Sequence, residues 1–239
     1  MTFDVWHSSW RGLAFLSLKS WEYVLFVIYV LIVLLLLYFS RRDFAKLTWQ
    51  RLALFAGLLF APLLADSLFV VRSSLLDVLP PPGVPVIPLA PIAPLLGLLP
   101  VAVAAAWLGA GPAMIVGLVC GFLRTGMLNG GVTEIFRFGY LGFAAGFFLR
   151  QNYRGKLPLI LRQPLVAGVV AALLSLIFFL ISVFMRSAAA GLAGLDYAVS
   201  LTWAYLLPSL LESVVAFGLL QAAYLVFPYL KPVRGYPRR

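Results

Sequence analysis

Long runs of apolar residues dominate the chain, and short polar, glycine-containing or proline-containing segments separate them. A helix that crosses the roughly 30 Å hydrocarbon core of a bilayer needs about 20 mostly apolar residues. Seven runs approach this length and predict an all-α, polytopic transmembrane helix bundle. They are Trp21–Ser40, Leu52–Val71, Leu89–Leu108, Ala113–Leu128, Ile135–Leu149, Leu165–Met185 and Val199–Phe227. Six spans are the alternative, because the fourth and fifth runs are short and need not both cross.

The segments around these runs divide the chain into five parts. Residues 1–20 are expected to form an interfacial N-terminal segment, with an irregular tail as the alternative. Residues 21–72 form a two-helix hairpin, and residues 73–94 form a proline-rich outer loop, since prolines at that density disfavour regular helix. Residues 95–227 form a glycine-rich five-helix bundle, and residues 228–239 form a basic cytoplasmic tail.

The composition indicates an integral membrane protein. Hydrophobic residues make up 63% of the chain and charged residues 11%, and the mean hydropathy is +1.04. An ordinary soluble domain has about 45–50% apolar and about 25% charged residues. A disulfide scaffold is excluded because Cys120 is the single cysteine.

The net charge of +10 reports membrane orientation rather than nucleic-acid binding, because Lys and Arg lie at the ends of the apolar runs. With the N-terminus outside and the C-terminus cytoplasmic, the inner segments hold twelve of the 18 basic residues and one acid, Asp43. The basic residues are Arg41, Arg42, Lys46, Arg51, Arg150, Arg154, Lys156, Arg162, Lys231, Arg234, Arg238 and Arg239. This asymmetry predicts a multi-pass protein of the inner (plasma) membrane with that orientation.

The chain carries no enzyme motif. His7 is its single histidine, so neither a histidine metal site nor a catalytic triad can be assembled. No P-loop, dinucleotide fingerprint, CxxC or HExxH sequence occurs. We therefore expect a non-enzymatic protein with no catalytic residues, no metal ligands and no cofactor.

Two pairs of glycines stand one helical turn apart, Gly117 with Gly121 and Gly142 with Gly146. Small residues at this spacing allow helix backbones to approach closely in lipid, which predicts tight packing between neighbouring spans. A substrate passage lined by glycine backbone is the alternative.

Ionisable residues within the apolar runs are the sharpest functional signal, because each is costly there unless it is paired or hydrated. Asp66, Arg124, Glu134 and Arg137 would lie in the outer leaflet and could form an outward-facing polar pocket; alternatively, the arginines extend to the outer interface. Glu212 would lie near mid-membrane. There it is either protonated and hydrogen-bonded within the bundle, or it relays protons or binds a cationic ligand.

The stretch Pro94–Gly131 resembles the membrane domain of the LYT-type bacterial sensor kinases. The similarity rests on a turn at Gly109–Pro112, on Gly117 and Gly121, on Arg124, and on Gly130 with Gly131. The basic segment Leu149–Pro164 also resembles an inner loop of sensor-kinase membrane modules from filamentous phototrophic bacteria. The glycine-rich pattern is similar as well to the rod-shape protein MreD and to substrate-binding components of energy-coupling-factor transporters.

The first resemblance implies a sensor-like or receptor-like membrane module that acts through a cytoplasmic output protein. A structural or accessory subunit of a larger membrane complex is the alternative, and a small transporter or transporter substrate-binding component is a third. The expected partners are membrane lipids, together with other membrane proteins or a cytoplasmic output protein, and no nucleic acid.

Overall fold

The computed structural model describes residues 20–68, 70–72, 92–127, 132–151, 155–189 and 195–228. Most of the expected N-terminal interfacial segment, the proline-rich loop up to residue 91 and the basic tail from residue 229 lie outside these ranges. The elements are α2 (Ser20–Phe39), α3 (Arg41–Phe44), α4 (Trp49–Leu68), β1 (Val70–Arg72), β2 (Ile92–Pro94), α5 (Leu99–Trp107), α6 (Ala110–Met127), α7 (Val132–Arg150), α8 (Lys156–Leu161), α9 (Pro164–Ala189) and α10 (Leu195–Val226). The prediction of a helical protein is confirmed.

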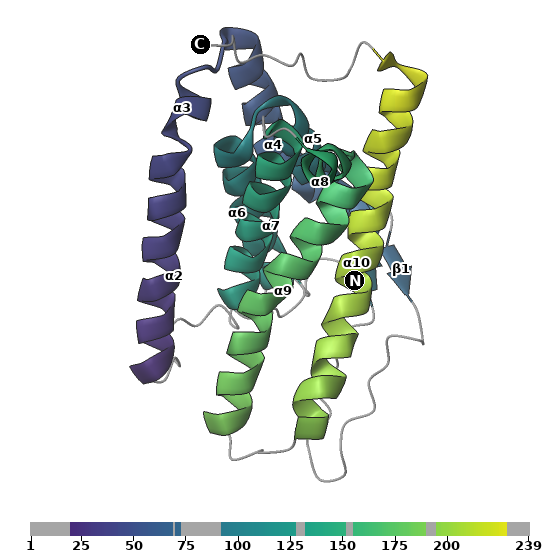
Figure 1. Ribbon diagram of the computed structural model, residues 1–239. Coiled ribbons are helices and arrows are strands. Elements are labelled where there is room, and N and C mark those ends of the chain that lie inside the picture. Colours follow the sequence, from purple (N-terminus) through teal and green to yellow (C-terminus); the bar gives the residue numbers. More distant parts are fainter. Residues whose placement is uncertain are drawn as a thin grey trace.

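The long helices run side by side in alternating directions, with α6 and α7 at the centre and α2 and α10 at opposite edges (Figure 1). One end of the bundle, which we call the α3 end, holds α3, the start of α4, the α5–α6 turn, α8 and the last turn of α10. The turn between α5 and α6 is tight because Gly109 adopts a φ of 112°, a conformation that residues with a Cβ atom rarely adopt.

The α6–α7 interface is a contact between backbones. A Cβ atom on Gly117 would overlap the backbone oxygen of Phe138, and one on Gly142 would overlap the backbone oxygen of Ala113. At the α3 end of the same interface, a Cβ on Gly146 would lie 2.7 Å from the Cα of Ala110. Of the four expected packing glycines, Gly117, Gly142 and Gly146 therefore lie on this interface, and Gly121 is buried farther along α6.

The third expected span, Leu89–Leu108, is not one helix among the residues that the structure describes. Its helical part, α5, has nine residues, a length of about 13 Å that cannot cross a bilayer alone. The residues before it form β2, which pairs antiparallel with β1 so that Val71 lies opposite Ala93. Pro94 contributes to the difference, because proline lacks the N–H group that an interior helical turn needs.

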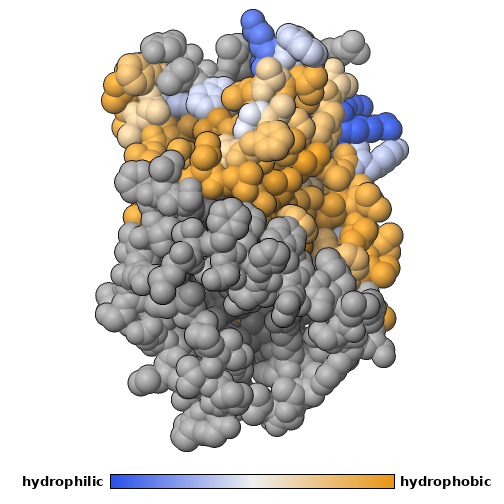
Figure 2. Space-filling model, turned by 180° about the vertical axis from the view of Figure 1, so that it is seen from behind, coloured by the Kyte–Doolittle hydropathy of each residue, from blue (hydrophilic) through white to orange (hydrophobic). Residues whose placement is uncertain are grey.

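The α5 helix is nonetheless central, since Val101, Ala102, Ala104, Ala105 and Ala106 are fully buried. It is surrounded by the longer helices that carry the exposed apolar side chains. Figure 2 shows apolar side chains spread across the described part of one face, with hydrophilic ones gathered near the α3 end.

Within the described ranges, one helical segment, Ser209–Val226, is long and apolar enough to cross a membrane. Shorter apolar segments are Phe26–Phe39, Trp49–Ala65, Ala110–Arg124 and Pro164–Phe178. The number of crossings stays a prediction.

Candidate functional site

A buried ion pair joins α6 to α10. The Nη1 atom of Arg124 donates a hydrogen bond of 2.6 Å to Oε2 of Glu212. The two side chains are 6% and 5% exposed, so the pair is almost completely withdrawn from solvent. A charge-assisted bond of this kind is one of the stronger side-chain interactions in proteins.

A second arginine, Arg137, contacts the same aromatic ring as Arg124. The guanidinium carbon of Arg124 lies 4.5 Å from the ring centroid of Phe138, and that of Arg137 lies 4.6 Å from it. Both distances are typical of cation–π contacts. We call Arg124, Arg137, Phe138 and Glu212 the polar cluster.

The direction of each helix explains why these side chains converge. Arg124 stands about 20 Å along α6 from the α3 end. Glu212 lies at a similar depth, because it is about 18 Å before Tyr224 on α10, and the Tyr224 ring packs edge-on against Trp107 beside the α5–α6 turn. Helical side chains tilt toward the N-terminus of their own helix. Arg124 therefore leans toward the α3 end while Arg137 and Glu212 lean away from it.

Two serines flank Glu212 on α10. Ser209 is 2% exposed and Ser213 is fully buried. Neither hydroxyl oxygen has a hydrogen-bond partner within the part of the chain that the structure describes. Each can accept or donate a hydrogen bond, so two neutral hydrogen-bonding groups lie within one helical turn of Glu212 along α10.

From the sequence, these residues are expected in two separate places, the arginines in an outer pocket and Glu212 near mid-membrane. The structure instead pairs Arg124 with Glu212 and brings Arg137 to the same cluster through Phe138. The side chains of Asp66 and Glu134 lie outside the described set. Phe138 was missed, because one phenylalanine among 19 carries no signal of its own. The one sequence signal that bears on its position is the glycine spacing on α6 and α7, because the backbone of Phe138 lies against Gly117.

A second polar contact, at the α3 end, connects α3 to the start of α6. Asp43 on α3 accepts hydrogen bonds from the backbone N–H groups of Ala110, at 3.0 Å, and Gly111, at 3.4 Å. The carboxylate thereby caps the first turn of α6, where it also faces the positive end of the helix dipole. The Arg150 guanidinium packs beside it over Gly109, where a Cβ atom would lie 2.6 Å from Nη1 of Arg150 and 2.8 Å from Oδ2 of Asp43.

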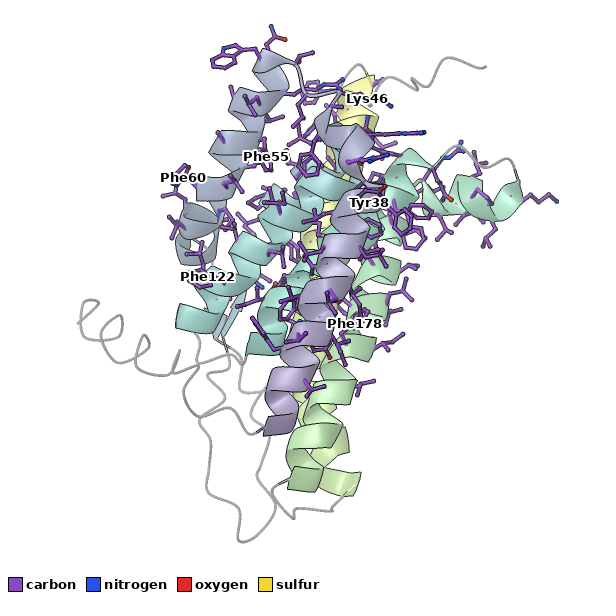
Figure 3. The ribbon with its side chains drawn as sticks, turned by 90° about the vertical axis from the view of Figure 1, so that its left-hand side faces the viewer. Tyr38, Lys46, Phe55, Phe60, Phe122 and Phe178 are labelled. Carbon is purple, nitrogen blue, oxygen red and sulfur yellow. The ribbon has the colours of Figure 1, made fainter. Side chains whose placement is uncertain are left out.

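Aromatic contacts attach α2 to the rest of the bundle. The Tyr29 hydroxyl donates a hydrogen bond of 3.1 Å to the backbone oxygen of Phe178, and the Tyr29 ring stacks on Phe136. Tyr140 stacks on Phe178 with centroids 3.9 Å apart. Figure 3 shows Phe178 close behind α2. An apolar groove of about 420 Å³ lies beside these rings, between α2, α6 and α7, and Phe122 is among the residues that line it.

No protein-family model, curated protein or solved structure matches the chain. The resemblances drawn from the sequence are therefore neither supported nor opposed by these comparisons. The residues themselves supply the functional argument. The polar cluster has two arginines, one carboxylate and neighbouring hydroxyls, a set that suits reversible ion pairing and hydrogen bonding.

Proposed function

We propose that this chain is a non-enzymatic, multi-pass protein of the bacterial inner membrane. Large apolar side chains are exposed along α2, α4, α9 and α10, where lipid would solvate them. At the α3 end, exposed aromatic residues lie in the last turn of α2, at the first position of α4 and directly after α10. They are Tyr38, Phe39, Trp49 and Phe227. A band of exposed aromatic residues at one end of a helix bundle is typical of a membrane–water interface.

The charge distribution supports a cytoplasmic α3 end. Among the described residues at that end, seven are basic and Asp43 is the single acid. The basic residues are Arg41, Arg42, Lys46, Arg51, Arg150, Lys156 and Arg162. A reporter enzyme fused after Arg239 should be active in its cytoplasmic form only. Activity of a periplasmic reporter at the same position would contradict this orientation.

Within this class, we propose a sensor-like or receptor-like module that acts through a cytoplasmic protein. The buried Arg124–Glu212 pair carries this proposal. Burying two charges costs several kcal/mol per ion, and well-packed apolar residues often stabilise a fold equally well. Ionisable residues at membrane depth usually mark a functional site. The pair therefore fits a two-state contact better than a structural brace.

The mechanism follows from what the pair connects. In one state, the Arg124–Glu212 ion pair links α10 to α6. In the other state, the pair separates and the hydroxyls of Ser209 and Ser213 supply replacement hydrogen bonds to the released groups. Because α10 ends at the basic α3 end, its displacement changes the surface that a cytoplasmic output protein would contact. A ligand drives the change only if it binds one state more tightly than the other.

Purification in a gentle detergent, followed by mass spectrometry of the accompanying proteins, tests the proposal. A cytoplasmic partner should accompany the wild-type chain, and its amount should change at least severalfold for the variant Arg124→Met with Glu212→Leu. Gly57→Ala on α4 is the matched control, because a Cβ at Gly57 meets nothing within 4 Å. An equal partner yield from all three chains would oppose the sensor proposal. A stoichiometric membrane partner would instead favour an accessory subunit.

One observation favours a transporter component as the second candidate. Among the residues that the structure describes, the buried helix α5 is short, and a turn and the strand β2 precede it, so the third expected span is interrupted. Transporters commonly use such interrupted elements to bind substrates within the membrane. Substrate uptake by vesicles that contain the purified chain and its membrane partners, lost when Glu212 is replaced, would favour this candidate over the sensor.

A further inference from the structure

The connection between α7 and α9 projects sideways from the bundle. The chain turns at Gly155, where φ is 144°, into the short helix α8. Figure 1 shows α8 near the α3 end, and Figure 3 shows this segment extending away from the bundle at the level of Tyr38. Three of its apolar side chains are strongly exposed: Leu157 at 68%, Leu159 at 59% and Ile160 at 48%.

Positive charge surrounds these apolar side chains. The sequence from Arg150 to Pro164 contains four basic residues and no acidic residue. Lys156, in the first turn of α8, is exposed, and Arg162 follows the last turn. Exposed Leu and Ile beside Lys and Arg are typical of segments that lie in the interface of an anionic membrane.

We propose that α8 is an interfacial anchor that binds the anionic phospholipids of the inner leaflet. Leu157, Leu159 and Ile160 insert at the boundary between headgroups and acyl chains, while Lys156 and Arg162 contact anionic headgroups. The inference rests on the proposed membrane placement, which puts Tyr38 at the inner interface and α8 at the same level. The exclusively basic charge of the segment complements an anionic leaflet.

The single cysteine makes the chain suitable for a depth measurement. Cys120 is fully buried, and Cys120→Ser gives a background without cysteine. Leu159→Cys then carries a fluorophore on α8. Ile177→Cys, at a site 51% exposed on α9 and about 20 Å along that helix from Pro164, is the control for membrane placement. The full chain is reconstituted into vesicles of phosphatidylcholine and phosphatidylglycerol that contain lipids spin-labelled near the headgroup or near the chain end.

The expected result is that headgroup-proximal labels quench the fluorophore at residue 159 more strongly, and chain-end labels quench the one at residue 177 more strongly. If residue 177 is quenched while residue 159 is quenched only by aqueous iodide, α8 projects into water and the anchor proposal is wrong. A protein docking site would then be the better interpretation. If lipid labels do not quench residue 177, the membrane placement itself is wrong.

The charge requirement is tested separately with Lys156→Gln in the Leu159→Cys background. A basic side chain near an anionic surface contributes enough to change lipid preference by up to about fivefold. The preference of the residue-159 probe for spin-labelled phosphatidylglycerol over spin-labelled phosphatidylcholine should fall accordingly. Lys156→Arg should retain the preference. An unchanged preference in Lys156→Gln would overturn the assignment of anionic headgroups as the ligand.

Discussion

Replacing one member of the buried ion pair should destabilise the protein strongly. Glu212→Gln keeps the shape of the side chain but removes its charge, and it leaves the Arg124 guanidinium 6% exposed without its carboxylate. Removing one partner of a buried pair costs about 3–5 kcal/mol in soluble proteins. If Glu212 were protonated, as the sequence allowed, glutamine would be tolerated. The contact with Arg124 reverses that expectation.

The geometry supports a magnitude of this size. The donor and acceptor atoms are 2.6 Å apart, and little solvent reaches either side chain to screen them. Opposite charges 4 Å apart attract by about 4 kcal/mol at an effective dielectric constant of 20. For a chain of this length, a loss of about 3–5 kcal/mol corresponds to a fall in melting temperature of about 6–20 °C.

A double substitution distinguishes a lost pair from a lost side chain. Arg124→Met with Glu212→Leu removes both charges and leaves neither one buried alone. Such replacements are often neutral or stabilising, so the double variant should melt above both single variants. The Phe138 ring loses its cation–π contact with Arg124 in this variant, which limits the recovery by about 1–2 kcal/mol.

Thermal unfolding in a mild detergent, followed by tryptophan fluorescence, gives the melting temperatures of the wild type, of Arg124→Met, of Glu212→Leu and of the double variant, with Glu212→Gln measured beside them. Two results would contradict a buried ion pair: Glu212→Gln melts at the same temperature as the wild type, or the losses in Arg124→Met and Glu212→Leu simply add in the double variant. Either result would mean that Arg124 and Glu212 do not interact in the folded protein.

Three further substitutions, each paired with a comparison variant, test the contacts between the helices. Gly117→Ala should lower the melting temperature because its methyl group meets backbone, whereas Gly57→Ala, which meets nothing, should stabilise α4 by about 0.5–1 kcal/mol; equal shifts would argue against the α6–α7 contact. Asp43→Ala should cost about 0.5–2 kcal/mol in urea unfolding, and Asp43→Asn much less, because Asn caps helices as well as Asp; equal losses would show that charge, not capping, matters. Tyr29→Phe should cost about 1 kcal/mol, and the exposed Tyr38→Phe close to nothing, in the same assay. Equal stability of these two variants would dismiss the hydroxyl contact that Tyr29 makes with α9.

The sequence predicted most of the helices because their signal is local. An apolar run of sufficient length that lacks breakers becomes a helix wherever it packs, and α2, α4 and α6 lie close to the expected runs. The third run failed for a local reason too. Its apolar residues satisfied the length rule, but the described residues from Ile92 to Pro94 form β2, where Pro94 lacks the N–H group that an interior helical turn needs, and helix begins at Leu99.

The ion pair could not be predicted from the sequence, because it depends on how two helices far apart in the chain are rotated and how far each extends along the bundle. Arg124 and Glu212 are 88 residues apart, and the pattern along each helix fixes only that helix's own apolar face. Counting from loop to loop assigned the two residues to different depths. In the structure the two residues lie at similar distances from the α3 end, and neither that relative placement nor the neighbouring helix is encoded near either residue.

The two kinds of interface indicate which part of the bundle would move under the proposed separation of the Arg124–Glu212 pair. The α6–α7 interface holds backbone against backbone at Gly117 and Gly142, so a change of rotamer cannot accommodate sliding at these two positions. Contacts of α10 with its neighbours are made by side chains instead, as where the Phe217 ring packs over Gly168 on α9. Side chains can repack, and backbone contacts cannot. Separation of Arg124 from Glu212 should therefore displace α10 against a fixed α6–α7 unit. A distance measured between labels on α10 and α6 should change in Glu212→Gln, while one between α6 and α7 should not.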